Sequence, residues 1–269
     1  MSRIAKGVPV NTAAQVNVIV TRPRADASAL CAIARQLGHR AVPSPVIDIV
    51  DNETIPMLDG VSALAFTSAN GVRAFAAKSD ERQIPAFAVG TATAKELRDA
   101  GFSRVLAANG DVASLGELIR SDRQSADQGT SWSGTVLHIA GTHQAGDLVG
   151  TLKAHAVPAE RAVLYEARAT GKPSDEALSV IDHAMGQKGT QIVVTFFSQR
   201  SVQLFCTDLE QARGDHPFKF IVALCISEAV AETAQNAAPV AWQEIRTALA
   251  PNTDAMGQLL AQLSPKECG

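Results

Sequence analysis

The sequence has few features of a secreted or membrane protein. Its four cysteines, Cys31, Cys206, Cys225 and Cys268, are scattered and form no CxxC pair, which favours reduced cysteines over a disulfide framework. The longest apolar runs have the length of a β-strand, well below the roughly 18 residues of a membrane-spanning helix. Residues 1–15 lack the apolar stretch of a signal peptide. We therefore expect a cytoplasmic protein without a membrane span.

Positive charge is also scarce. Lys and Arg number 24 against 27 Asp and Glu, so the formal net charge is −3, and the basic residues form no cluster. Binding to a phosphate backbone needs such a cluster. We expect no nucleic-acid partner.

The motifs that bind common cofactors are missing. Residues 141–146 have the glycine spacing of a phosphate-binding loop, but Asp147 and Leu148 stand where lysine and serine or threonine are required. The chain has neither the GxGxxG fingerprint of dinucleotide binding nor the GxSxG turn of hydrolases. Its six histidines lack ligand spacing on any one helix. We expect no metal and no organic cofactor.

The chain does contain a regular alternation of strands and helices. Its 269 residues, 46% of them hydrophobic, suffice for one large domain or two ordinary ones. Short apolar runs alternate with segments of helical periodicity, which indicates α/β architecture with parallel sheets covered on both faces. The expected strands cover residues 16–20, 63–66, 86–89, 105–107, 135–140, 220–226 and 240–242, with another beginning at Ile192. The expected helices follow Asp26, Ser68, Gly90 and Ser198, and cover residues 112–119, 148–156, 175–185, 228–236 and 253–263.

Three segments interrupt this alternation. Residues 41–50 contain Pro43 and Pro45, which excludes a central strand and favours an edge ribbon or a connector. Residues 162–168 alternate in the same way. The polar segment 121–133 is the clearest candidate for a linker.

One strand-to-helix corner occurs twice. Residues 63–75 and 192–205 each consist of a buried strand and a helix start, and Ser68 matches Ser198. A serine at this point caps the helix. The free N–H groups of a helix start and the helix dipole favour anions. Two such corners indicate a protein that binds an anionic ligand from two sides.

Further corners extend the repeat. Residues 20–22 match residues 139–141, and residues 89–91 match residues 226–228. The pattern taken alone indicates an imperfect duplication of residues 16–120 and 135–263. Ligands of open parallel sheets bind beyond the carboxyl ends of the strands, so we expect two lobes with a ligand cleft between them.

Each candidate side chain also has a simpler interpretation. Ser68, Ser198, Ser227 and Thr93 are explained by helix capping alone, although their recurrence at equivalent corners favours ligand binding. Arg22 and Arg24 follow a buried strand, where they either bind a carboxylate or remain solvated charges. Tyr165, the single tyrosine, is either a packing residue or part of a site.

The ordered motifs Val20–Pro23, Phe66–Val72, Ala88–Ala94 and Val163–Glu166 resemble those of the uroporphyrinogen-III synthase family. The resemblance covers residues 16–263. It implies two flavodoxin-like α/β lobes with parallel sheets, joined by a two-stranded ladder, with the ligand cleft between the lobes. The implied bounds are residues 1–40 with 170–269 for one lobe, 51–160 for the other, and 41–50 with 161–169 for the ladder. These bounds replace the two consecutive halves, residues 16–120 and 135–263, that the pattern of corners alone indicates.

The same resemblance implies a reaction without a cofactor. A hydro-lyase of heme biosynthesis would cyclise hydroxymethylbilane, a linear tetrapyrrole, to uroporphyrinogen III with inversion of ring D. It would act as a monomer and could receive its substrate from hydroxymethylbilane synthase. Tyr165 would assist departure of the substrate hydroxyl. The expected substrate-binding residues are Arg22, Arg24, Thr67, Ser68, Ala69, Asn70, Gly90, Thr91, Thr93, Gly141, Thr142, Phe197, Ser198, Gln199 and Ser227.

The chain departs from the family pattern in two places. Val230 stands where a threonine is usual, and Thr142 and His143 follow the strand where an arginine is often found. The alternative function is that of a two-lobed small-molecule-binding or regulatory protein without catalysis.

Overall fold

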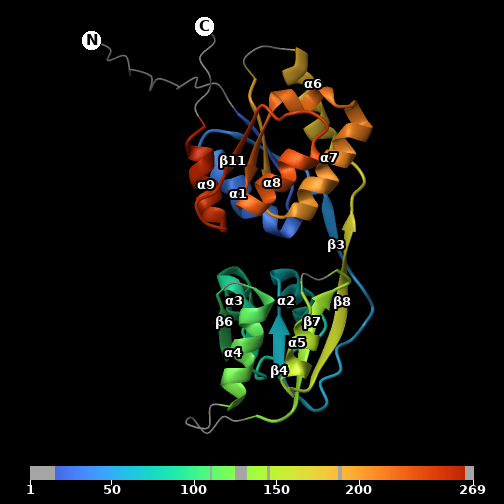
Figure 1. Cartoon of the computed structure of the whole chain (residues 1–269), viewed down its shortest axis with the longest axis vertical. Helices are drawn as coiled ribbons and strands as arrows, with labels where there is room; N and C mark the ends of the chain where they lie inside the picture. Colours follow the sequence, from blue (N-terminus) through green and yellow to red (C-terminus); the bar gives the residue numbers. More distant parts are fainter. Residues whose placement is uncertain (1–15, 110, 125–131, 144–145, 187–189, 264–269) are drawn as a thin grey trace, which may run out of the picture. The chain divides into compact units, whose positions relative to one another are not determined.

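The computed structural model describes residues 16–109, 111–124, 132–143, 146–186 and 190–263. The chain divides into two compact units. Unit 1 contains the described residues up to Asp48 and from Ala169 onward, and unit 2 contains Ile49–Arg168 (Figure 1).

Unit 1 is built on a parallel sheet whose strands lie in the order β11-β10-β9-β1-β2. With the strands renumbered along the chain, this is the flavodoxin-like order 2-1-3-4-5. The buried apolar residues of β1, β9 and β10 form near-continuous runs, as expected of strands covered on both faces. The strands are β1 (Asn17–Val20), β2 (Arg40–Pro43), β9 (Ile192–Phe196), β10 (Ile221–Cys225) and β11 (Glu244–Thr247).

The helices of unit 1 pack in two groups. The first and last helices of the described chain, α1 (Arg24–Gln36) and α9 (Thr253–Ala261), contact each other (Figure 1, blue and red). The other group consists of α6 (Asp175–Gly186), α7 (Gln199–Arg213), α8 (Glu228–Ala237) and the 3₁₀ turn η2 (His216–Phe220). The chain adds strands in both directions from the neighbouring strands β1 and β9. Because crossovers between parallel strands are right-handed as a rule, the helices on the two sides of this point are expected on opposite faces of the sheet.

Unit 2 is built on a sheet with the order β3-β8-β7-β4-β5-β6. Its parallel part, from β8 to β6, repeats the spatial order of unit 1 with β7 in the place of β1 and β4 in the place of β9. The two units therefore share one architecture with a different chain order. The strands are β3 (Ile47–Asp51), β4 (Val61–Phe66), β5 (Ala86–Val89), β6 (Val105–Ala108), β7 (Thr135–Gly141) and β8 (Ala159–Ala169).

Alternate residues of β4 face different cores of unit 2. Leu64 and Phe66 pack with residues of α2 (Ala69–Ala76) and α3 (Gly90–Asp99). Ala63 and Ala65 pack with residues of α4 (Val112–Gln124) and α5 (Leu148–Ala154). The period of two follows from strand geometry. It places Ala63 and Ala65 toward α4 and α5.

The α/β fold with parallel sheets is confirmed, but the two consecutive halves expected from the corner pattern are wrong. β1 pairs with β2 on one side, but on its other side it pairs with β9, a strand of the second half. The expected ribbon 41–50 is also divided, because β2 lies at the edge of one sheet and β3 at the edge of the other. Both are edge positions, in agreement with Pro43 and Pro45.

Other differences lie near segment ends. Residues 240–242 form no strand; β11 begins at Glu244, and the Trp242 ring packs against Phe218 with 5.0 Å between ring centroids. Ala156 lies beyond α5 and has φ 58°. The expected linker is partly helical, since α4 continues to Gln124, and residues 125–131 lie outside the described residues.

The expected helix caps are only partly correct. Ser68 and Ser198 cap α2 and α7 through their side chains. Asp26 lies in the first turn of α1, whose N-cap is Pro23. Thr93 is a buried residue inside α3, and Ser227 is the N-cap of α8 without a side-chain hydrogen bond.

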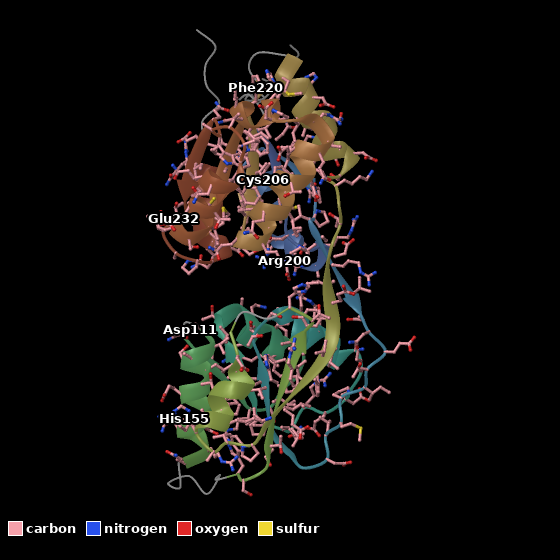
Figure 2. All side chains as sticks on the ribbon, turned by 45° about the vertical axis from the view of Figure 1, so that its right-hand side comes forward. Asp111, His155, Arg200, Cys206, Phe220 and Glu232 are labelled. Atoms are coloured by element: carbon pink, nitrogen blue, oxygen red, sulfur yellow. The ribbon has the colours of Figure 1, made fainter. Side chains whose placement is uncertain are left out.

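Three cysteines confirm the expectation of reduced core residues. Cys31, Cys206 and Cys225 are free and buried, and Figure 2 shows Cys206 within unit 1. Burial raises the pKa of the Cys206 and Cys225 thiols to about 12, so both stay protonated. Cys268 lies outside the described residues. None of the helices in the described part of the chain has the length and apolar character needed to cross a bilayer.

Candidate functional site

A cavity of about 740 Å³ lies at the carboxyl ends of the unit 2 strands. This is the edge at which parallel α/β sheets bind ligands. The lining residues come from the last residue of β5, from the segments that follow β4, β6 and β7, and from β8. They are Thr67, Ser68, Val89, Asp111, Val112, Ala113, His143, Gly146, Asp147, Thr151 and Tyr165.

The most specific contact in this cavity joins Tyr165 of β8 to Ser68. The Tyr165 hydroxyl lies 2.9 Å from Ser68 Oγ. Ser68 Oγ also accepts a hydrogen bond from Gly71 N at 3.3 Å as the cap of α2. Only 7% of Tyr165 is exposed, so the hydroxyl marks the end of a buried ring. A helix cap and a phenol therefore meet at one point of the cavity.

Gly141 gives the Tyr165 ring its space. The β7/β8 register shifts between Ala140 and Gly141, so that Gly141 opposes Tyr165. A Cβ atom at Gly141 would lie 2.6 Å from Tyr165 Cε2. Thr142 N donates to the Tyr165 carbonyl at 3.0 Å. Gly141 and Thr142 therefore contact Tyr165, but they are not among the residues that line the cavity.

A second pair of side chains meets at Thr67. Thr67 Oγ1 lies 3.3 Å from His138 Nε2 of β7, and only 1% of His138 is exposed. Burial, with a further contribution from the Arg161 cation, lowers the pKa of His138 to about 4. The imidazole is therefore neutral at physiological pH.

Two aspartates border the cavity. Asp111 Oδ1 accepts from Ser114 N at 3.0 Å at the start of α4, and Asp147 Oδ1 accepts from Gly150 N at 2.9 Å as the cap of α5. The backbone hydrogen bond from Ser114 lowers the pKa of Asp111. Figure 2 shows Asp111 and His155 toward opposite ends of unit 2. The N-termini of α4 and α5 are thus occupied by the protein's own carboxylates.

The expected residues around α2 and α3 lie at the same edge. Asn70 Oδ1 accepts from Arg73 Nη2 at 2.5 Å, and Arg73 pairs with Glu96 of α3 at 3.1 Å. Because arginine can only donate, the Asn70 amide nitrogen is directed away from Arg73. Thr91 is exposed in the first turn of α3. Ala69 is the first residue of α2 and Gly90 the first of α3.

The matching serine corner of unit 1 lacks a tyrosine. Ser198 Oγ accepts from Ser201 N at 3.1 Å and lies 2.7 Å from the Ser201 hydroxyl. Gln199 Nε2 donates to the Ala229 carbonyl at 3.3 Å. Besides the backbone N–H that it caps, Ser198 thus has a hydroxyl partner in its own helical turn, Ser201. The corresponding partner of Ser68 in unit 2 is Tyr165 of another strand.

Arg22 of unit 1 contacts Phe197, Thr253 and Asp26. Its guanidinium lies 4.4 Å from the centre of the Phe197 ring, Nη1 is 3.4 Å from Thr253 Oγ1, and Nη2 is 3.7 Å from Asp26. Arg24 is exposed on the first turn of α1. Of the expected site residues, the cavity thus brings together Thr67, Ser68 and Tyr165. Arg22, Arg24, Phe197, Ser198, Gln199 and Ser227 belong to the other unit.

Sequence reasoning missed His138 and the two aspartates. A histidine among the otherwise apolar residues 136–140 was one available signal, because polar residues are rare in buried strands. Asp111 and Asp147 each precede a helical pattern, which is the position of a cap. Across the described residues, no group of three or more His, Cys, Asp and Glu side chains could hold a metal ion.

The family comparison and two of the most similar solved structures name the same family. The family described as "Uroporphyrinogen-III synthase HemD" matches residues 28–257. The chain is similar to uroporphyrinogen-III synthetase from Helicobacter pylori, with 17% identity, a TM-score of 0.58 and coverage of 91% of this chain and 98% of that one. It is also similar to a mutant uroporphyrinogen III synthase from Thermus thermophilus, with 15% identity, a TM-score of 0.50 and coverage of 91% and 97%. No curated protein matches.

At these identities the solved structures support the fold, and the family match rests on most of the length of the chain. A binding protein without catalysis is not favoured, because the matched family is one of synthases. The chain belongs to the uroporphyrinogen-III synthase family, whose members are enzymes of tetrapyrrole synthesis.

Proposed function

We propose that the chain is a hydro-lyase that cyclises hydroxymethylbilane to uroporphyrinogen III. The terminal hydroxyl leaves as water and an electrophilic azafulvene remains. The substituted carbon of ring D attacks it to give a spiro intermediate, which fragments and closes again with ring D inverted. The observation that carries this proposal is the Tyr165 hydroxyl on the cavity, 2.9 Å from Ser68 Oγ.

Tyr165 would donate a hydrogen bond to the departing hydroxyl. Ser68 Oγ already accepts from Gly71 N, and its own proton is suited to Tyr165 Oη as acceptor. The phenol proton is then directed to the substrate. A hydrogen bond that strengthens as the C–O bond breaks lowers the barrier to departure.

The substrate carboxylates would bind at the starts of α2 and α3. Each pyrrole ring carries an acetate and a propionate, so the substrate is a polyanion. Asp111 and Asp147 cap α4 and α5 and repel further anions there. No side chain caps α3, whose N-cap is Val89, so its first N–H groups suit a carboxylate. The charge pattern of the cavity thus orients the substrate.

The wider organisation belongs to the same proposal. We retain lobes of residues 1–40 with 170–269 and of residues 51–160, joined by residues 41–50 and 161–169. We also propose a monomer that works in the cytoplasm and receives its substrate from hydroxymethylbilane synthase. Folding of the bound chain, rather than a cofactor, would bring ring D to the azafulvene.

An isomer assay tests the function. The protein is added to freshly made hydroxymethylbilane, the products are oxidised, and the porphyrin isomers are separated. Isomer III should appear where the uncatalysed control gives isomer I. Folded protein in excess that leaves isomer I as the product would reject the proposal and favour a binding or regulatory role.

A further inference from the structure

Two consecutive residues at the end of β4 meet side chains of neighbouring strands. Ser68 meets Tyr165, and this contact belongs to the proposed mechanism. Thr67 meets His138 at 3.3 Å, and the proposed mechanism does not use this contact. Both Thr67 and Ser68 line the cavity. The contact between Thr67 and His138 therefore has no role in the proposed mechanism as it stands, although Thr67 lines the same cavity.

The strand pattern explains why an imidazole fits at position 138. His138 is in register with Ala65 of β4, whose small side chain leaves room beside it. The alternation of β7 places His138 on the same face as Val136, which packs under α4 and α5. Thr67 lies two residues beyond Ala65, just past the end of β4, and lines the cavity together with Val112 of α4 and Thr151 of α5. The two side chains thus meet at the cavity end of this core.

The hydrogen-bonding options of His138 are limited. The neutral imidazole carries one N–H and one acceptor nitrogen. Nδ1 is buried and has no hydrogen-bond partner among the described residues. Thr67 Oγ1 is the partner of Nε2. The position of one proton therefore decides whether Thr67 accepts from His138 or donates to it.

The two tautomers make Thr67 a different ligand for the substrate. If His138 donates from Nε2, the Thr67 oxygen is satisfied as an acceptor and its proton remains for the cavity. If His138 accepts at Nε2, the threonine proton is used and only lone pairs face the cavity. Lone pairs repel carboxylates, and the cavity already holds two carboxylates in Asp111 and Asp147.

We propose that His138 is a positioning residue that donates from Nε2 to Thr67 and so directs the Thr67 hydroxyl proton to a substrate carboxylate. This proposal rests on the proposed function for the identity of the carboxylate. His138 does not touch the substrate. It decides whether the Thr67 hydroxyl, which contacts the substrate in this proposal, donates or accepts a hydrogen bond there.

The tautomer itself can be measured without substrate. Protein labelled with ¹⁵N at histidine gives ring-nitrogen shifts and couplings that distinguish Nε2–H from Nδ1–H, and the His138 signals are assigned by their loss in His138→Gln. The expected result is Nε2–H with a neutral ring at pH 7. An Nδ1–H tautomer overturns the proposal.

A double-mutant cycle tests the path from His138 through Thr67. Thr67→Val removes the hydroxyl and keeps the shape, and His138→Met removes the donor. Each should raise the Kd for uroporphyrin III, the stable oxidised product, by about tenfold. The KM for hydroxymethylbilane should rise with it while kcat changes little, since the contact serves substrate and transition state alike.

The proposal requires that the two effects do not add. His138→Met should cost no further affinity in the Thr67→Val background. Additive losses would mean that His138 acts independently of Thr67, and would overturn the proposal. His138→Gln keeps an N–H near the position of Nε2 and should restore binding to within about threefold of wild type. The matched control is Thr135→Val at the opposite end of β7, which should change none of these quantities.

Failure of this inference is distinguishable from failure of the proposed function. Wild-type protein that makes no isomer III rejects the function, whereas the tautomer is decided on the free protein. Circular dichroism checks the fold of each variant. If His138→Met does not fold, normal binding by His138→Gln together with the Nε2–H tautomer supports the proposal, and tenfold weaker binding by a folded His138→Gln contradicts it.

Discussion

The Tyr165 hydroxyl lies 2.9 Å from Ser68 Oγ, although 97 positions separate the two residues in the chain. At the equivalent corner of unit 1, Ser198 instead meets the hydroxyl of Ser201 at 2.7 Å, within the same helical turn. A shared helix cap thus has a local partner in one unit and a distant one in the other. This difference is the reason why we propose the chemistry at the unit 2 corner.

Tyr165→Phe should lower kcat for isomer III by about a hundredfold. The Kd for uroporphyrin III should change by less than about threefold, because the assisting hydrogen bond acts mainly as the hydroxyl departs. Single-turnover kinetics and product titration measure the two effects, with Thr135→Val as the control for hydroxyl loss. An unchanged kcat would return the tyrosine to a packing role.

Gly141→Ala should reduce kcat through displacement of Tyr165. The new methyl group would lie 2.6 Å from Cε2 and 2.8 Å from Cζ of the ring, so the ring has to move. Such overpacking costs about 1–3 kcal/mol of stability.

Gly186→Ala is the matched control for this variant. Its Cβ meets nothing within 4 Å, so stability should stay within about 0.5 kcal/mol of wild type. Kinetics and denaturant unfolding check both variants. Full turnover by folded Gly141→Ala would show that the ring position does not matter.

Thr91→Pro should weaken product binding by about tenfold or more, because it removes a backbone donor at the open start of α3. Proline is tolerated in the first turn of a helix, so the fold should persist. Thr91→Ala should bind almost as wild type does. Titration with uroporphyrin III compares the two.

Glu176→Pro makes the same change at the second residue of α6 and should leave product binding unaltered. Equal losses in Thr91→Ala and Thr91→Pro would contradict recognition by backbone amides and favour the side chain.

Asp111→Asn should tighten product binding about twofold at low salt. Asparagine keeps the cap on α4 but removes a negative charge from the cavity that holds a polyanion. The gain should shrink as salt rises, because exposed charges are screened. Asp59→Asn, an exposed change in unit 2 outside the cavity lining, is the control. A loss of affinity would show that Asp111 binds the substrate directly.

His138 should make unit 2 less stable as the pH falls from about 6.5 to 4. Its pKa is lowered to about 4 in the folded state, so the unfolded chain takes up the proton first and stability rises with pH across this window. The shift corresponds to about 3 kcal/mol. Arg161 lowers this pKa further and Asp147 opposes the shift.

Urea unfolding at several pH values tests this effect in His138→Gln and its parent. Trp132 lies in unit 2 and Trp242 in unit 1, so both proteins carry Trp242→Phe to leave one fluorescent reporter. The variant should show a flatter pH dependence. Burial raises the pKa of Asp208, so its contribution to stability falls as the pH rises, opposite to that of His138. Asp208 is present in both proteins, and its effect cancels in the comparison. Parallel curves would show that His138 does not titrate in this window.

Short-range patterns in the sequence determined most of the helices and strands. The apolar runs of β4 and β9, each followed by a serine and a helical pattern, were sufficient to predict the strands, the Ser68 and Ser198 caps and the repeated corner. Caps and periodicity act over a few residues, so they can be read from the chain directly. The ordered motifs also sufficed to recognise the family.

Some local patterns were ambiguous. Val240–Trp242 alternates like a strand, but the Trp242 ring packs on Phe196 and Phe218, and pairing with β10 begins only at Glu244. Thr93 resembles a cap, yet helix α3 already begins at Gly90. In both cases tertiary packing decided between conformations of similar local preference.

Only the tertiary structure decided which strands are neighbours and which side chains meet. β1 lies between β2 and β9, and no periodicity within either segment specifies that pairing. In unit 2, β7 lies between β8 and β4, and this order brings Tyr165 of β8 to Ser68 and His138 of β7 to Thr67, the two residues that follow β4. Strand pairing depends on the burial of whole faces across the sheet, and this free energy belongs to the assembled core rather than to any one segment.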